Sequence, residues 1–124
     1  MGSMKKILVV EDDQSTADIL ELRLCAAGYD PVIARDGKYG WHFAKSEKPD
    51  LVIMDVGLPM IDGFSLCDMI KKDKDLKDTP VIMLTAKNTV GDWEDGFSAG
   101  ADAYLNKPYV WDRLLLKIKE LLGA

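Results

Sequence analysis

The chain has 124 residues, enough for one domain with a substantial hydrophobic core and too few for two. Hydrophobic residues make up 48% of it and charged residues 30%, as in an ordinary globular protein, and the net charge of -5 argues against nucleic-acid binding by this domain. Because no apolar run approaches the roughly 18 to 20 residues that span a bilayer, and the start carries no signal-peptide pattern, we expect a cytoplasmic protein without membrane contact.

Apolar strands and helices alternate along the chain, beginning with a strand over residues 5–10 that runs into three acids, Glu11, Asp12 and Asp13. Ser15, with Asp18 three residues later, is a capping-box variant and predicts a helix start. A helical stripe then continues to Gly28, and its apolar members are Ala17, Leu20, Leu24 and Ala27. We expect Asp13 to be a helix cap rather than a metal ligand.

The middle of the chain contains the most apolar strand. Residues 30–35 form a short strand whose Pro31 cannot donate to a ladder, which predicts a position at a sheet edge. Residues 37–46 form a second helix. In residues 51–55 four apolar side chains run unbroken into Asp55, before a Gly, a Leu and a Pro end the run, as in a strand that is buried on both faces.

The second half repeats the alternation. A third helix begins after Asp62-Gly63, and the charged run of residues 71–78 that follows it reads as a solvated helix end and loop. Residues 79–84 form a buried strand before Thr85. A fourth helix, over about residues 88–99, contains two glycines that each cost up to about 1 kcal/mol relative to Ala, so it should be the least rigid helix. A strand over residues 101–106 and an amphipathic helix from Trp111 complete the chain.

Residues outside this pattern support a single domain. The first three residues, Met-Gly-Ser before Met4, look like an expression scar, so we expect the domain to cover residues 4–123. Cys25 and Cys67 lie far apart at apolar helix positions, which favours buried free thiols over a disulfide. His42, the one histidine, lies on a predicted surface helix and is expected to be inert.

The alternation predicts an α/β fold, a doubly wound parallel sheet of five strands with five helices. The edge position of the second strand favours the flavodoxin-like order 2-1-3-4-5. The carboxyl ends of the other strands then place five polar side chains around one crevice, which are Glu11, Asp12, Asp55, Thr85 and Lys107.

These side chains suit phosphoryl transfer to an aspartate. Two like charges about 4 Å apart repel by about 4 kcal/mol at an effective dielectric constant of 20, so a carboxylate cluster favours a bound cation. Oxygen ligands with open water positions suit Mg²⁺. Asp55 would be the nucleophile, Lys107 would supply positive charge, and the Thr85 hydroxyl could donate to the aspartyl phosphate.

Four segments then give the chain a specific resemblance to a known family. They are VVEDD after the first strand, MDVGLPMIDG around Asp55, VIMLTA, and AGADAYLNKP before the last helix. In this order and at these spacings they resemble the receiver domain of response regulators in two-component signalling, the CheY-like superfamily. The resemblance covers essentially the whole chain after the first three residues.

The resemblance implies the site residues and their roles. Asp55 would be the phosphoacceptor, and Glu11, Asp12, Asp55 and the Gly57 carbonyl would hold Mg²⁺, with Glu11 acting through water because it stands where many members have Asp. Such a domain is a regulatory phosphoacceptor rather than an enzyme, although it assists its own phosphorylation and dephosphorylation. No organic cofactor is implied.

The resemblance also implies a switch. Thr85 would be the switch hydroxyl and Tyr104 the aromatic that follows it, unless Tyr104 is only a half-buried strand aromatic; Lys107 would precede a cis proline. Gly57 and Lys87 occupy positions that tune dephosphorylation in the family.

The implied partners are a sensor histidine kinase or a phosphotransfer protein. The output surface would be that of helix 4, strand 5 and helix 5, through which the domain would dimerise or bind a target. Trp93 and Trp111 would be anchors on this surface or would simply pack against the fold.

Three other classes of protein remain to be weighed. A flavin-binding domain needs a phosphate-cradling loop after the first strand, where this chain has acids. An aspartate-dependent phosphatase needs a second aspartate two residues after the nucleophile, and that position is Gly57. The alternative that stays open is a receiver-like binding module that works independently of phosphate.

Overall fold

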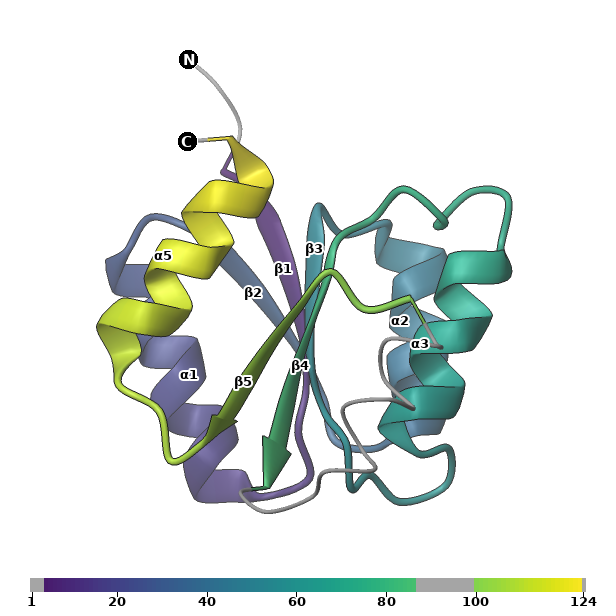
Figure 1. Cartoon of the computed structure of the whole chain (residues 1–124), viewed down its shortest axis with the longest axis horizontal. Helices are drawn as coiled ribbons and strands as arrows, with labels where there is room; N and C mark the ends of the chain where they lie inside the picture. Colours follow the sequence, from purple (N-terminus) through teal and green to yellow (C-terminus); the bar gives the residue numbers. More distant parts are fainter. Residues whose placement is uncertain (1–3, 87–99, 124) are drawn as a thin grey trace.

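The structure of the chain is a computed structural model that describes residues 4–86 and 100–123 (Figure 1). Its strands are β1 (Lys6–Val10), β2 (Asp30–Ala34), β3 (Leu51–Asp55), β4 (Val81–Ala86) and β5 (Ala103–Lys107). Its described helices are α1 (Gln14–Ala26), α2 (Gly37–Glu47), α3 (Gly63–Lys72) and α5 (Trp111–Leu122). The helix predicted over about residues 88–99, together with Lys87 and Trp93, lies outside the described residues.

All four strand pairs of the sheet are parallel, and the order β2-β1-β3-β4-β5 confirms the prediction. Strand β2 lies at the edge, where Pro31 is paired in register with Ile7 of β1. The missing N–H of a proline is tolerated at such an edge. The acid-bearing strands β1 and β3 are neighbours in the sheet, with Val10 opposite Met54.

The helices cover both faces of the sheet. Figure 1 shows α1 and α5 on one face and α2 and α3 on the other. Strand β3 supplies both cores, because Leu51 and Ile53 pack in the cluster that includes α1 and α5, whereas Val52 and Met54 pack in the cluster that includes α2 and α3. All four side chains are fully buried, which confirms a strand buried on both faces. None of the described helices is both long and apolar enough to cross a membrane.

The N-cap of helix α1 lies two residues before the predicted one. Asp13 is the N-cap in an extended conformation, and its carboxylate accepts hydrogen bonds from the backbone N–H and the hydroxyl of Thr16 at 2.9 and 2.7 Å. The prediction of a cap at Ser15 is therefore wrong, because Ser15 already lies within the first turn. The expectation that Asp13 caps the helix is confirmed.

The prediction that both cysteines are buried free thiols is confirmed only in part. Cys25 and Cys67 are both free, as expected, but Cys25 is exposed and only Cys67 is buried. Cys25 follows the buried Leu24 directly and so projects from the solvent-facing side of α1, as does Ala27 just after the helix. Burial raises the pKa of the Cys67 thiol to about 12, so this thiol is unreactive at neutral pH.

The charged run of residues 71–78 is more ordered than predicted. The Lys71 ammonium donates to the Thr79 carbonyl and to Asp102, both at 2.7 Å, and thereby joins the end of α3 to the segment before β5. Asp73 accepts from Lys45 of α2 at 2.8 Å, and Leu76 is buried. This run therefore ties together elements that are distant in the sequence.

Candidate functional site

The carboxyl ends of the central strands bring together most of the predicted site residues. Oxygen atoms of Glu11, Asp12 and Asp55 lie within 4.8 Å of one another. These acids follow or end the adjacent strands β1 and β3, so the parallel pairing itself places them at one edge of the sheet. Lys107 reaches the same place from the end of β5.

Lys107 is the cation of this cluster. Its ammonium donates to Asp55 Oδ2 at 3.0 Å and lies 3.6 Å from Glu11 Oε1. Partial burial lowers the pKa of Lys107, but the hydrogen bond to Asp55 and the charges of Asp55 and Glu11 outweigh it and hold that pKa above its ordinary value. Lys107 is therefore charged at neutral pH and partly neutralises the acids. The peptide bond from Lys107 to Pro108 is cis, as predicted.

Glu11 is the most buried acid of the cluster, with only 2% of its surface exposed. Burial raises the pKa of this carboxyl, opposed by a hydrogen bond from the backbone N–H of Asp13 to Oε2 at 3.1 Å and by the charge of Lys107. Oε1 has no hydrogen-bond partner among the described residues. A buried carboxylate oxygen that lacks a donor favours a cation beside it.

The donor set fits a hard divalent cation. All three acids offer carboxylate oxygens, which Mg²⁺ prefers. Asp12 is exposed and Asp55 is half-buried, so water could complete the coordination on the solvent side. Gly57 is also exposed, and a Cβ added to it would meet nothing within 4 Å, so it leaves the region beside Asp55 open. The role of the Gly57 carbonyl as a ligand stays a prediction.

The predicted switch residues are both buried. Thr85 has no exposed surface and follows Leu84, the residue of β4 that pairs with Asp55. Tyr104 lies on β5 opposite Met83, with 8% of its surface exposed, and packs in the cluster that includes α2 and α3. Tyr104 is thus more buried than a half-buried strand aromatic, whereas its switch role stays a prediction. Lys87 lies outside the described residues.

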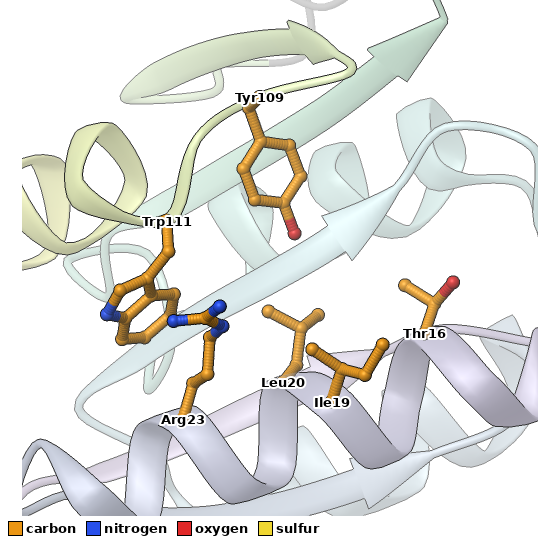
Figure 2. Close-up of a pocket in the computed structure, with 6 residues that line it drawn as sticks. All are labelled: Thr16, Ile19, Leu20, Arg23, Tyr109 and Trp111. Carbon is orange, nitrogen blue, oxygen red and sulfur yellow. The ribbon is translucent and has the colours of Figure 1, made fainter.

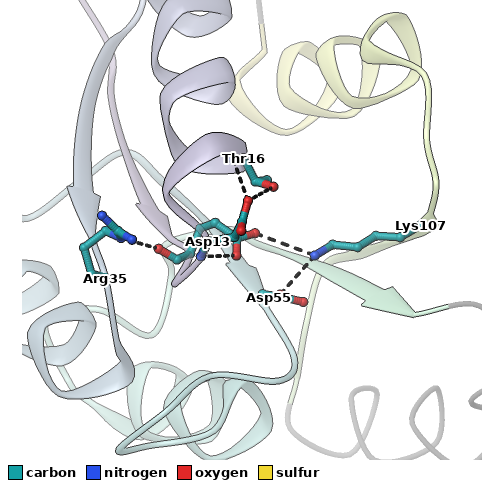
Figure 3. Close-up of polar contacts among 6 residues, drawn as sticks. Asp13, Thr16, Arg35, Asp55 and Lys107 are labelled. Atoms are coloured by element: carbon teal, nitrogen blue, oxygen red, sulfur yellow. Dashed lines mark hydrogen bonds and ion pairs between the residues drawn. The ribbon is translucent and has the colours of Figure 1, made fainter.

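Two residues that support the site were not singled out from the sequence. Gly63 begins α3 beneath Asp55, where an added Cβ would lie 2.3 Å from the Asp55 carbonyl oxygen, so only glycine fits there. Arg35 follows β2 and donates to the loop after β1, as Figure 3 shows on the side opposite Lys107. Gly63 could have been found from its place in an Asp-Gly turn, but Arg35 carries no motif signal.

A hollow of about 280 Å³ lies between α1 and the segment that leads into α5 (Figure 2). Its lining residues are Thr16, Ile19, Leu20, Arg23, Tyr109 and Trp111. The Arg23 guanidinium stacks over the Trp111 ring at 5.6 Å from the ring centroid. Trp111 therefore packs against α1. The hollow lies near the acidic cluster, because Tyr109, one of its lining residues, interacts electrostatically with Lys107, Glu11 and Asp55.

The fold and this site define a doubly wound α/β domain with an acidic crevice, suited to a divalent cation, at the carboxyl edge of its sheet. The chain belongs to the response regulator receiver domain family, whose sequence profile matches residues 7–119. The family predicted from the four segments of the sequence is thereby confirmed.

Known proteins similar to the chain agree with this assignment. The DNA-binding dual master transcriptional regulator RpaA of Synechocystis is 40% identical over 96% of this chain and 49% of its own length. A putative response regulator from Chloroflexus aurantiacus has a similar structure, with a TM-score of 0.93 and 36% identity over 98% of this chain and 100% of that one. The chain spans about half the length of the curated relatives it matches.

A further solved structure bears on the metal. The receiver domain of the sensor histidine kinase PA1611 from Pseudomonas aeruginosa has a TM-score of 0.90 and 30% identity, over 98% of this chain and 100% of that one. Its active-site cleft coordinates a magnesium ion. The acidic cluster of the present chain has the oxygen donors that such an ion requires.

Proposed function

We propose that this domain is a phosphorylation-activated signalling switch. Asp55 accepts a phosphoryl group from a phosphohistidine of a sensor kinase or a phosphotransfer protein, in a reaction that depends on Mg²⁺. The observation that carries the proposal is the grouping of three carboxylates within 4.8 Å, with Lys107 bonded to Asp55. The domain, taken as residues 4–123, is regulatory rather than an enzyme, and it assists its own phosphorylation and dephosphorylation.

The chemistry requires an oxygen of Asp55 to attack phosphorus while the bond to the donor nitrogen breaks. When bound by Glu11, Asp12, Asp55 and the Gly57 carbonyl, Mg²⁺ supplies positive charge to the phosphoryl oxygens. Lys107 already contacts Asp55 and can shift its hydrogen bond to a phosphoryl oxygen. The half-buried position of Asp55 leaves access for the donor from the solvent side.

The switch depends on the residues beside the acceptor. A phosphoryl group brings about two negative charges and strong acceptor oxygens to a crowded site. The Thr85 hydroxyl then donates to it, and the Tyr104 ring adjusts its packing. Gly57 and Lys87 set how fast water removes the phosphoryl group, and the open space beside Gly57 supports rapid access of water.

The output surface comprises helix 4, strand 5 and helix 5, of which the structure describes β5 and α5. A hollow of about 380 Å³ between β5 and the start of α5 supports this assignment. It is lined by Tyr104 itself and by the cationic side chains of Arg113 and Lys117. A change at Tyr104 would therefore alter a surface that a second copy or a target protein could contact.

The donor reaches Asp55 across the hollow that α1 forms with Tyr109 and Trp111. Ile19 and Leu22 of α1 are more than half exposed and could bind apolar side chains of a kinase. Tyr109, which lines the hollow, interacts electrostatically with Asp55 and Lys107, so a partner seated there would lie near the acceptor.

Thermal melting with Mg²⁺ and beryllofluoride, an analogue of the phosphoryl group, tests this function. Because ligands that bind only the folded state raise its stability, we expect a higher melting temperature for the wild type and no beryllofluoride effect for Asp55→Asn. Asp78→Asn, at an exposed position on another face, is the matched control and should behave as the wild type. A wild type that ignores the analogue would favour the phosphate-independent binding module.

A further inference from the structure

We propose that Arg35 is a positioning residue for the acidic loop, and that its guanidinium fork sets the affinity of the site for Mg²⁺. This inference rests on the proposed function, because it concerns the metal of that site. The loop consists of residues 11–13, between β1 and α1. Arg35 does not contact the acceptor and acts through the backbone of two metal-binding residues.

The position of Arg35 follows from the sheet. The Glu11 N–H donates to the Ala34 carbonyl at 2.9 Å, which extends the ladder between β1 and β2 by one residue beyond the strands. Arg35 therefore leaves the edge strand level with the acidic loop. Lys107 reaches the cluster from the β5 side, so the loop is held from two opposite sides (Figure 3).

The guanidinium group makes three hydrogen bonds, two to the backbone of this loop and one to the side chain of Gln14 at the start of α1. Nε donates to the Glu11 carbonyl at 3.2 Å, and Nη2 donates to the Asp12 carbonyl at 2.7 Å. Nη1 donates to the Gln14 side chain, whose own amide binds Asp18 at 2.8 Å. The planar fork thus binds two consecutive carbonyls at once, which a lysine ammonium on a flexible stem does not reproduce.

Asp12 depends on this support more than Glu11 does. The Glu11 carboxylate is held by the Asp13 N–H and lies near Lys107. The Asp12 carboxylate is exposed and makes no hydrogen bond within the described part of the chain, so only the backbone of Asp12 fixes the position from which it can reach a metal. Groups that orient metal ligands in this indirect way typically change metal affinity 10- to 100-fold when they are removed.

Calorimetric titration with Mg²⁺ distinguishes an effect of the shape of the Arg35 side chain from an effect of its charge. We expect Arg35→Lys, which keeps the charge, and Arg35→Met, which removes it, each to weaken Mg²⁺ binding about tenfold. Lys77→Met, which removes a positive charge at an exposed position in the run of residues 71–78, is the control and should stay within about twofold of the wild type. If Arg35 acted only by its charge, Arg35→Met would bind Mg²⁺ more tightly, and that result would overturn the proposal.

A second readout distinguishes positioning from damage to the fold. In phosphorylation by acetyl phosphate, the half-saturating Mg²⁺ concentration of Arg35→Lys should rise about tenfold, while the rate at saturating Mg²⁺ stays within about twofold of the wild type. If Arg35→Lys binds Mg²⁺ as tightly as the wild type, the role proposed for Arg35 is overturned, but the proposed metal site is not. A wild type that binds no Mg²⁺ overturns the proposed metal site as well. Arg35→Lys decides the outcome even if Arg35→Met does not fold.

Discussion

Glu11 and Asp12 are neighbours in the sequence but meet opposite environments. Glu11 is almost fully buried, and its carboxylate is held by the backbone N–H of Asp13. Asp12 is exposed and supplies its carboxylate from the solvent side. Glu11 therefore contributes to the packing of the fold as well as to the cluster, whereas Asp12 can be removed without leaving a cavity.

Asp12→Ala is the sharpest single-residue test of the metal site. Because it removes one of three clustered carboxylates, we expect it to abolish the rise in melting temperature that Mg²⁺ causes in the wild type. Without metal, loss of one like charge should leave stability unchanged or raise it by up to about 1 kcal/mol. Asp78→Ala is the control. A full Mg²⁺ effect in Asp12→Ala would remove Asp12 from the ligand set.

The sequence predicted the acids and the lysine of the site better than their supports. Glu11, Asp12, Asp55 and Lys107 were found because each ends or follows a predicted strand, and parallel strands bring such ends together. Arg35 was not predicted as a site residue, because its partners are mainly backbone carbonyls, which every residue has. Asp13 and Ser15 were both candidates for the cap of α1, and the hydrogen bonds that the Asp13 side chain accepts from Thr16 distinguished them.

At the scale of elements, one ion pair links α2 to the end of α3. The Lys45 ammonium donates to Asp73 at 2.8 Å and also lies over the Trp41 ring. The hydrogen bond from Lys45 holds the pKa of Asp73 below its ordinary value of 3.8, and the same bond holds the pKa of Lys45 above 10.5. The stability that Asp73 contributes to the fold is thus present above pH 3.8 and is lost as pH falls through the lowered pKa of the folded state. The stability that Lys45 contributes is lost as pH rises through its raised pKa.

Asp73→Asn should reveal this link by its pH dependence. The amide keeps the shape and can still accept backbone hydrogen bonds, but it removes the charge. We expect the melting temperature to fall by about 1–3 °C at neutral pH, and the difference to disappear as the pH falls through the lowered pKa of Asp73, where the wild-type carboxyl is protonated as well. Asp68→Asn, in an exposed pair within α3, is the control and should change little. A difference that persists in acid would exclude the ion pair as its cause.

The kind and order of the elements were predicted well, and their details less so. The central strands β1, β3 and β4 were predicted correctly because unbroken apolar runs must be buried on both faces of a parallel sheet. The run of residues 71–78 was misread because the partners of Lys71 and Asp73 are distant in the sequence. Cys25 was misplaced because a thiol is compatible with either face of α1. The weak helix predicted over about residues 88–99 lies outside the described residues.

At the scale of the whole molecule, the doubly wound order places one acidic crevice at the carboxyl edge of a sheet that has a hydrophobic cluster on each face. The two hydrophobic clusters lie on opposite faces of the sheet and share β3, the strand that carries Asp55. Tyr104 packs in one cluster and also lines the hollow beside α5. Chemistry at the edge of the sheet and the proposed output surface are therefore linked by packed residues.

Phosphorylation should change how the domain associates. With beryllofluoride and Mg²⁺ we expect a second copy to bind through the β5 and α5 surface, so that light scattering reports a mass near that of a dimer. Asp55→Asn should remain unchanged under the same conditions. An unaltered mass for the wild type over a wide range of protein concentration would contradict dimerisation and favour a different target protein for this surface.

Mass spectrometry of the intact protein after incubation with acetyl phosphate and Mg²⁺ tests the central claim most directly. We expect one phosphoryl adduct on the wild type, lost when Mg²⁺ is chelated beforehand. We expect none on Asp55→Asn, because an amide is not a nucleophile for this transfer. A wild type without an adduct, or an adduct of equal yield on Asp55→Asn, would contradict the assignment of Asp55 as the phosphoacceptor.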